Sequence, residues 1–211
     1  MSLSDVQDRV QKNPARRLKY LYLVRMFFAV AWVITLTLLP LAAQKGAYPN
    51  LIAAALLVIY PVSDVIATIF DIRATPSIAR VPQRINLVAG ILTAAGIAVA
   101  SLSSWGAVSF IFGFWAIASG AVMLIVAIRR RRIVGGQWMM ILSAVGSIAG
   151  GLGFLQYLGG QVTITTLETY SEGGAFFYLI SALLLTRLGT NLSKAVQQAF
   201  GRATAVDGAE D

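Results

Sequence analysis

The stretch from Ala107 to Arg132, AVSFIFGFWAIASGAVMLIVAIRRRR, contains the two features that decide the fold of this chain. Between Ala107 and Ile128 it includes no charged residue, and about 20 predominantly apolar residues are enough for a helix to span the hydrocarbon core of a bilayer. Four consecutive arginines then follow, and basic residues in a short connection favour the cytoplasmic side of a membrane. The stretch therefore predicts a transmembrane helix that ends in the cytoplasm.

The composition of the whole chain agrees with this prediction. Of its 211 residues, 57% are hydrophobic and only 12% are charged, whereas about a quarter of the residues in an ordinary soluble domain are charged. Because charged side chains sit mostly in water on the surface of a soluble fold, so few of them would cover that surface only thinly. We therefore expect an integral membrane protein rather than a soluble globular domain.

Five further apolar runs flank the opening stretch, at residues 21–43, 51–70, 85–102, 138–158 and 175–188. The last run is short and needs a few flanking residues to reach membrane length, and the first is too long for the apolar core of a cleaved signal peptide. The predicted fold class is all-α, a polytopic membrane protein with six transmembrane helices. We expect a basic cytoplasmic segment at 1–20, the transmembrane domain at 21–188 and a cytoplasmic tail at 189–211.

The basic residues predict the orientation of these six spans. All but one of the 17 lie before or just inside the first run, in the second and fourth connections, or at the end of the sixth run and in the tail; the exception is Lys45. This distribution places both termini in the cytoplasm. A five-span arrangement would put at least one basic cluster outside.

The net charge of +8 would suggest nucleic acid in a soluble protein. Here topology and attraction to anionic lipid account for it, so we expect no nucleic-acid partner. The expected contacts with anionic lipid headgroups are Arg16, Arg17, Lys19, Arg129, Arg130, Arg131 and Arg132.

A repeat connects the runs in pairs. At one constant offset, Ser63 and Arg73 of the second run align with Ser119 and Arg129 of the fourth, and at a similar offset the third run aligns with the fifth. A recurring unit of this length predicts one helical hairpin used three times.

The pattern from Val88 to Leu152 resembles the HdeD-like family of short-repeat bacterial membrane proteins. It has a glycine-spaced helix at Ala89-Gly90-Ile91-Leu92, a Ser-Gly helix from Trp115 to Arg129, and a Trp-led start at Gln137-Trp138. The resemblance implies six spans in a bacterial inner membrane and a role in acid or stress resistance, without a catalytic site. The family often has a proline where an odd helix reaches the outer face; Pro40 fits, but nothing comparable follows the third or fifth run.

Asp64 and Arg25 are the charged residues inside the apolar runs, apart from Arg187 at the end of the sixth. An ionisable group in the membrane is costly and usually faces the bundle interior or a cavity. Arg25 enters the adjacent antiparallel helix from the same side, and Tyr60 lies one turn from Asp64, beside the helix-disrupting Pro61. We consider two roles for this intramembrane polar site: Asp64 binds a proton or cation during transport, or its contact with Arg25 or Tyr60 fixes the helix packing.

Small residues recur in the fifth run at Ser143, Ser147 and Gly151, a spacing that allows close helix contact. The contact would lie either within the chain or in a homo-oligomer. The chain has no cysteine and no histidine, which excludes disulfides and His/Cys metal sites and leaves no acid-base pair for an intramembrane enzyme. We expect a non-enzymatic protein without metal or cofactor, whose partner is the lipid bilayer and for which no small-molecule substrate can be named; the alternative is a small transporter or channel subunit.

Overall fold

The computed structural model describes residues 14–38, 49–74, 80–132, 137–156 and 167–187, and these residues form helices and short turns with no strand among them. This confirms the predicted all-α class for the described part. In chain order, the helices are α2 (Pro14–Leu38), α3 (Leu51–Ala74), α4 (Val81–Ala100), α5 (Trp105–Arg130), α6 (Trp138–Gln156) and a sixth helix at residues 167–187, called helix 167–187 below.

Local chemistry explains where several of these helices begin. α2 begins at Pro14, because the missing N–H of a proline costs nothing in the first turn. The Asn50 side chain accepts a hydrogen bond at 2.8 Å from the backbone of Ala53 at the start of α3. Ser104 does the same for α5, accepting from the backbone of Ala107 at 3.1 Å. Such N-caps satisfy backbone donors that the first helical turn leaves unpaired.

Five of the six helices, α2 to α6, are long and apolar enough to cross a membrane. Helix 167–187 is not among them, and Glu168 and Glu172 lie in its first turns. It begins earlier than the apolar run at 175–188, so the flanking residues that this run required are helical. α2 likewise begins before the apolar run at residue 21 and includes Arg16, Arg17 and Lys19. These helices are compatible with an integral membrane protein.

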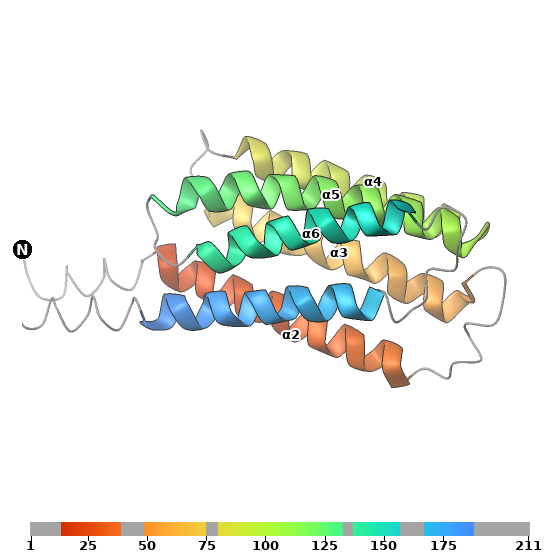
Figure 1. Cartoon of the computed structure of the whole chain (residues 1–211), viewed down its shortest axis with the longest axis horizontal. Coiled ribbons are helices and arrows are strands. Elements are labelled where there is room, and N and C mark those ends of the chain that lie inside the picture. The colour runs from red at the N-terminus through yellow and green to blue at the C-terminus, as the bar shows by residue number, and fades with distance from the viewer. Residues whose placement is uncertain (1–13, 39–48, 75–79, 133–136, 157–166, 188–211) are drawn as a thin grey trace, which may run out of the picture.

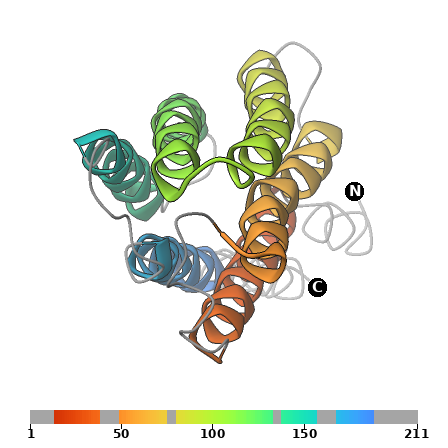
Figure 2. The ribbon, with the colours of Figure 1, turned by 90° about the vertical axis from the view of Figure 1, so that its right-hand side faces the viewer.

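Consecutive helices run antiparallel along the long axis of the molecule (Figure 1). Seen from one end, they surround a common centre, each beside its neighbour in sequence, and helix 167–187 lies beside α2 (Figure 2). The start of α2, the end of α3 and the end of α5 therefore meet at one end, which we call the basic end. Its residues include Arg16, Arg17, Lys19, Arg73, Arg129, Arg130, Arg131 and Arg132.

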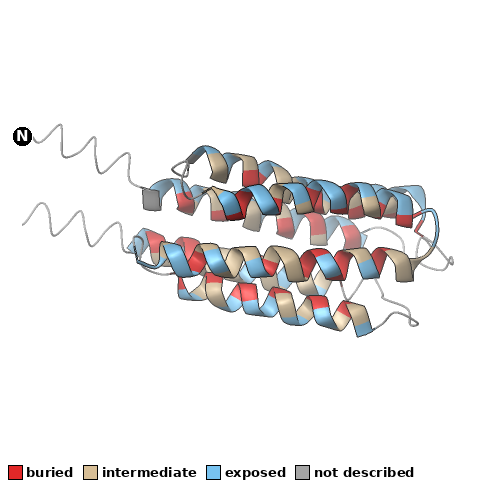
Figure 3. Ribbon diagram, turned by 90° about the horizontal axis from the view of Figure 1, so that it is seen from above, coloured by how far each residue is buried: buried red, intermediate tan, exposed pale blue. Residues whose placement is uncertain are grey.

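Two clusters of buried side chains hold the bundle together. One is aromatic, includes Trp32, Phe112 and Trp115, and lies away from the basic end. The other lies at the basic end and joins Leu18 and Tyr22 of α2 to α5, α6 and helix 167–187. The outer faces of the helices are exposed and apolar (Figure 3). A continuous exposed apolar surface is unfavourable in water and suits contact with lipid.

The small-residue face of α6 packs against α5 inside the chain. A Cβ atom placed on Gly151 would lie 2.7 Å from the carbonyl oxygen of Gly113, and one placed on Gly120 would lie 2.9 Å from that of Ala144. The Ser147 hydroxyl donates to the Ala116 carbonyl at 3.0 Å. Only residues without bulk allow two helix backbones to approach this closely. Of the two uses predicted for this face, the described residues display the intramolecular one.

Some predicted features lie outside the described residues. They include Pro40, Lys45 and the tail at 189–211, together with most of the segment at 1–20.

Candidate functional site: a polar cavity inside the bundle

A cavity of about 1660 Å³ lies inside the bundle, and side chains from all six helices line it. Binding sites for small molecules typically enclose roughly 300–1,000 Å³. The cavity is therefore larger than a site for a single ion requires. Apolar side chains form most of its wall, so its few polar groups determine what chemistry it can offer.

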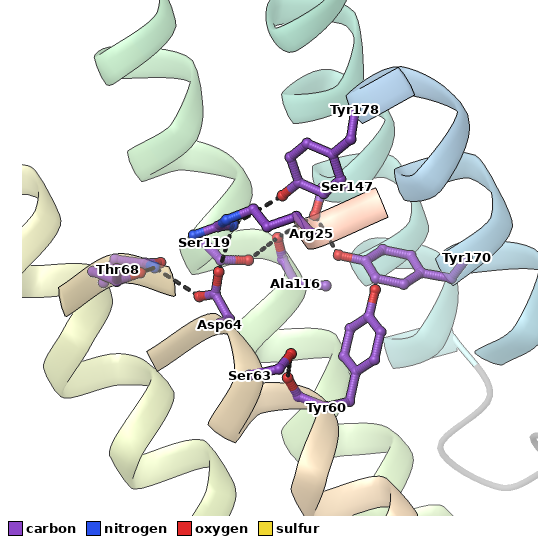
Figure 4. A network of polar contacts seen from close by, with 11 residues as sticks. Arg25, Tyr60, Ser63, Asp64, Thr68, Ala116, Ser119, Ser147, Tyr170 and Tyr178 are labelled. Atoms are coloured by element: carbon purple, nitrogen blue, oxygen red, sulfur yellow. Dashed lines mark hydrogen bonds and ion pairs between the residues drawn. The ribbon is translucent and has the colours of Figure 1, made fainter. Parts of the chain in front are cut away.

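An ion pair between Arg25 of α2 and Asp64 of α3 forms the centre of the polar lining. The two groups are 2.6 Å apart, and their side chains are only 20% and 13% exposed. The same nitrogen of Arg25 donates a hydrogen bond to the Tyr178 hydroxyl of helix 167–187 at 2.9 Å (Figure 4). One arginine of α2 thus connects the neighbouring helix α3 to helix 167–187, which is far away in sequence.

The second oxygen of Asp64 is held by α4. The Asn86 side chain donates to it at 2.7 Å and also to the hydroxyl of Thr68 at 2.9 Å. Hydrogen bonds to a charged group are stronger than those between neutral groups. Both carboxylate oxygens therefore have partners, and the opposite charge of Arg25 offsets much of the cost of burying this carboxylate.

The structure brings Arg25 and Asp64 together and places Tyr60 differently. The Tyr60 ring packs 4.6 Å from that of Trp32 and 5.8 Å from that of Trp115, measured between ring centroids. Ring pairs at such distances are favourable beyond the area they bury. Tyr60 thus packs among the aromatic rings of the cavity wall. The neutral residue that bonds to Asp64 is Asn86, and not Tyr60 as the sequence suggested. α3 continues through Pro61 without ending.

A second ion pair lies at the basic end, where Arg130 of α5 bonds to Asp71 of α3. Nearby, the Tyr22 hydroxyl donates to the side-chain carbonyl of Gln137 at 3.2 Å. Arg130 is half-buried and turned toward Asp71 of α3, whereas most of the other residues predicted to contact anionic lipid are exposed. Arg16, Arg17, Arg129, Arg131 and Arg132 are exposed and Lys19 is half-exposed.

Several polar atoms in the cavity wall are buried without a hydrogen-bond partner. They are the Arg25 Nε, the side-chain oxygens of Gln83 and Asn86, and the Trp115 Nε1. The side chains of Gln83, Asn86 and Trp115 belong to residues that are only 4%, 8% and 5% exposed. These atoms have almost no accessible surface, so the cavity does not reach them, and they are polar groups buried in the helix packing.

A third polar contact joins α6 to helix 167–187. The hydroxyls of Ser147 and Tyr170 are 2.5 Å apart, and Ser147 also donates to α5. Among the described residues, no group of three histidine, cysteine or acidic side chains could hold a metal ion.

Sequence reasoning found the charged pair and missed its neutral neighbours. Gln83 and Asn86 lie three residues apart at the start of α4, so they share one helix face. Two polar amides on one face of an apolar helix could have indicated a polar site. A search restricted to charged residues does not find them. Asp71 was missed because it lies just beyond the apolar run at 51–70, close to Arg73.

No protein-family model, curated protein or solved structure matches the chain. The fold and the site by themselves define a class: a helical protein compatible with a membrane, with a mainly apolar cavity between its helices and a largely buried arginine–aspartate pair in the cavity wall.

Proposed function

We propose that the chain crosses the inner membrane of a bacterium six times, with helix 167–187 as the sixth span and both termini in the cytoplasm. The meeting of the basic residues at one end of the bundle supports this orientation, because short basic connections remain cytoplasmic. The repeat of three hairpins is supported by one shared detail. Ser63 donates to the carbonyl three residues earlier, at 2.7 Å, and its aligned partner Ser119 does the same at 3.4 Å.

Cysteine labelling tests the orientation, since the chain has no cysteine of its own. Ser103 and Arg131 are both exposed and lie at opposite ends of the bundle. A membrane-impermeant thiol reagent added to whole cells made permeable only in their outer membrane is expected to label Ser103→Cys. Arg131→Cys should react only after the inner membrane is opened. The reverse pattern would contradict the proposed orientation.

The function that the geometry supports best is transport of protons or cations through the cavity, with Asp64 as the site that binds them. The observation that supports it is the largely buried Arg25–Asp64 pair, which lies in the wall of a large cavity lined by all six helices. If the pair served only to pack the helices, we would expect side chains to fill the space around it. A guest that bonds to one member of the pair would weaken the link between α2 and α3, so solute binding and helix movement would be coupled.

Flux measurements in proteoliposomes test this proposal. A pH-sensitive dye sealed inside the vesicles reports proton movement when a pH gradient is imposed. We expect flux with the unaltered protein and none with Asp64→Asn. The double variant Arg25→Gln/Asp64→Asn leaves no unpaired charge and serves as the folded comparison, and Asp71→Asn alters the other ion pair. Flux that is equal in all four proteins would exclude the proposed role of Asp64.

Membership of the HdeD-like family is the second proposal, with a non-enzymatic role in acid or stress tolerance. The observation that favours it is the close α5–α6 contact at Gly113, Gly120 and Gly151, which lies in the stretch that resembles the family. Tight helix packing would limit proton leak through the membrane. Deleting the gene and measuring growth across acidic pH tests this role. If the Asp64→Asn protein restores growth to the deletion strain, the result favours the stress-tolerance role over transport.

A further inference from the structure

The lining of the cavity carries an excess of positive charge. Five arginines and two aspartates line it. The aspartates are paired with Arg25 and Arg130, so the excess comes from the other three arginines: Arg17 of α2, Arg73 of α3 and Arg129 of α5. Among the described residues none of these three has an acidic partner, and all three are exposed, so a guest can reach their guanidinium groups.

These three arginines lie at one end of the cavity. They belong to the start of α2, the end of α3 and the end of α5, which meet at the basic end. Arg16, Arg131 and Arg132 are exposed at the same end but do not line the cavity. The structure thus divides the basic residues into those that border the cavity and those that do not, and the sequence does not show this division.

The cavity opens on the outer face of the bundle between α2 and α3. On the basic side of the Arg25–Asp64 pair, apolar residues of both helices line the cavity although each is more than half exposed: Tyr20, Val24, Ile66 and Phe70. Toward the other end the two helices are joined, because the Trp32 indole nitrogen donates to the Leu56 carbonyl at 2.8 Å. The opening therefore lies on the same side as the arginines, and it faces lipid acyl chains if the helices cross a membrane.

The cavity wall behind this opening is mostly apolar. α5 contributes Val122, Met123 and Val126 to it, and helix 167–187 contributes Phe177. Trp115 also lines the cavity and lies within one turn of the middle of α5. The cavity thus extends from the arginines to about the middle of a membrane-spanning helix, which is the depth that an acyl chain reaches in one leaflet of a bilayer.

The charges and the apolar wall together select the guest. Exposed guanidinium groups favour an anion, and they match the paired oxygens of a phosphate. The apolar part of the wall disfavours a small hydrophilic anion, because its polar groups would lose their hydration there. The proposed orientation places the arginines at the headgroups of the cytoplasmic leaflet, which contains anionic phospholipids.

We propose that the cavity binds an anionic phospholipid, with its phosphate at Arg17, Arg73 and Arg129 and one acyl chain that enters between α2 and α3 and reaches toward Trp115. The inference rests on the proposed insertion in the membrane and goes beyond the proposed transport, since it requires binding and does not require flux. The bound headgroup also lowers the positive charge that a proton or cation meets on its way to Asp64, so the two proposals are compatible.

Tryptophan quenching tests this binding, because bromine atoms on an acyl chain quench only tryptophans close to them. The protein is reconstituted in phosphatidylcholine vesicles with an increasing fraction of phosphatidylglycerol or of phosphatidylethanolamine, both brominated near the end of the same acyl chains. The signal of Trp115 is the difference between the unaltered protein and Trp115→Phe. We expect half of this signal to be quenched at an about tenfold lower fraction of phosphatidylglycerol, a ratio that corresponds to about 1.4 kcal/mol and is within what three arginines near an anionic headgroup supply.

Two triple variants separate this site from a general attraction to the basic end. Arg17→Gln/Arg73→Gln/Arg129→Gln removes the exposed arginines of the cavity and should abolish the preference for phosphatidylglycerol. Arg16→Gln/Arg131→Gln/Arg132→Gln removes the same charge from the same end but no residue of the cavity, and it should keep the preference. If Trp115→Phe does not fold, native mass spectrometry makes the same comparison by counting the phosphatidylglycerol molecules that the unaltered protein and each triple variant retain in detergent.

Four results would overturn the proposal. Equal quenching by the two lipids would mean that the site does not recognise the anionic headgroup, and an equal loss of preference in both triple variants would mean surface attraction only. Displacement by an equal amount of soluble glycerophosphoglycerol would show that no acyl chain is bound, and quenching by brominated stearate at the same fraction as by phosphatidylglycerol would make the guest a free fatty acid. Selective quenching without flux supports the lipid site and contradicts transport, whereas flux without selective quenching contradicts the lipid site alone.

Discussion

The contact between α5 and α6 gives the sharpest prediction about stability. A Cβ atom on Gly151 would lie 2.7 Å from the Gly113 carbonyl oxygen, 2.7 Å from a side-chain carbon of Ile117 and 2.9 Å from the Ile117 backbone nitrogen. Two of these three neighbours are backbone atoms, so the side chain cannot be accommodated by a rotamer change. The substitution Gly151→Ala must push the two helices apart.

The magnitude follows from two opposing terms. Overpacking of a tight contact costs about 1–3 kcal/mol, and replacing glycine by alanine inside a helix returns roughly 0.5–1 kcal/mol. We therefore expect Gly151→Ala to lose up to about 2.5 kcal/mol of unfolding free energy, with a middle value of about 1 kcal/mol. Gly153 is the matched control, because it lies in the same helix and a Cβ there meets nothing within 4 Å. Gly153→Ala should keep the helical gain and be as stable as the unaltered protein or more so.

The assay is unfolding of the purified protein in one detergent, followed by the loss of helical circular dichroism as a denaturing detergent is added. Both variants are measured at the same protein concentration, so that any self-association affects them equally. If Gly151→Ala proved as stable as Gly153→Ala, the close approach of α5 and α6 would be wrong.

Three further substitutions test other contacts in the same assay. Asp64→Asn leaves Arg25 buried without a counter-charge and should cost about 3–5 kcal/mol, most of which the double variant with Arg25→Gln should recover; additive losses would contradict a direct pair. Tyr22→Phe removes the hydrogen bond to Gln137 and should cost about 0.5–1.5 kcal/mol, and an unchanged midpoint would mean the bond contributes nothing. Ser104→Ala removes the α5 cap and should cost about 1 kcal/mol, with faster amide exchange confined to the first turn of that helix.

The helical class and the approximate helix positions could be predicted because a bilayer restricts the choices. In lipid, every backbone polar group must be satisfied within the chain, so a run of about 20 apolar residues forms a helix. The ends of the helices were harder to predict, since α2 begins within a basic segment and helix 167–187 begins at residues that include two glutamates. At these positions capping and packing decide where the helix begins, and the hydropathy of the sequence does not show these effects.

The charged members of the site could also be predicted, because a charge within an apolar run requires a partner. The neutral members could not. Asn86, Gln83 and Tyr178 look ordinary in sequence, and each reaches the cavity only because its helix is rotated to place that face inward.

The sequence alone thus determined an all-helical chain of membrane-spanning length and the separation of its basic residues from its apolar runs, since both follow from transfer energies that act residue by residue. Only the tertiary structure decided that Arg130 turns inward to Asp71, that Asn86 rather than Tyr60 bonds to Asp64, and that a cavity remains between the helices. Those outcomes depend on how side chains from distant segments fill the space around one another, and no local pattern records that.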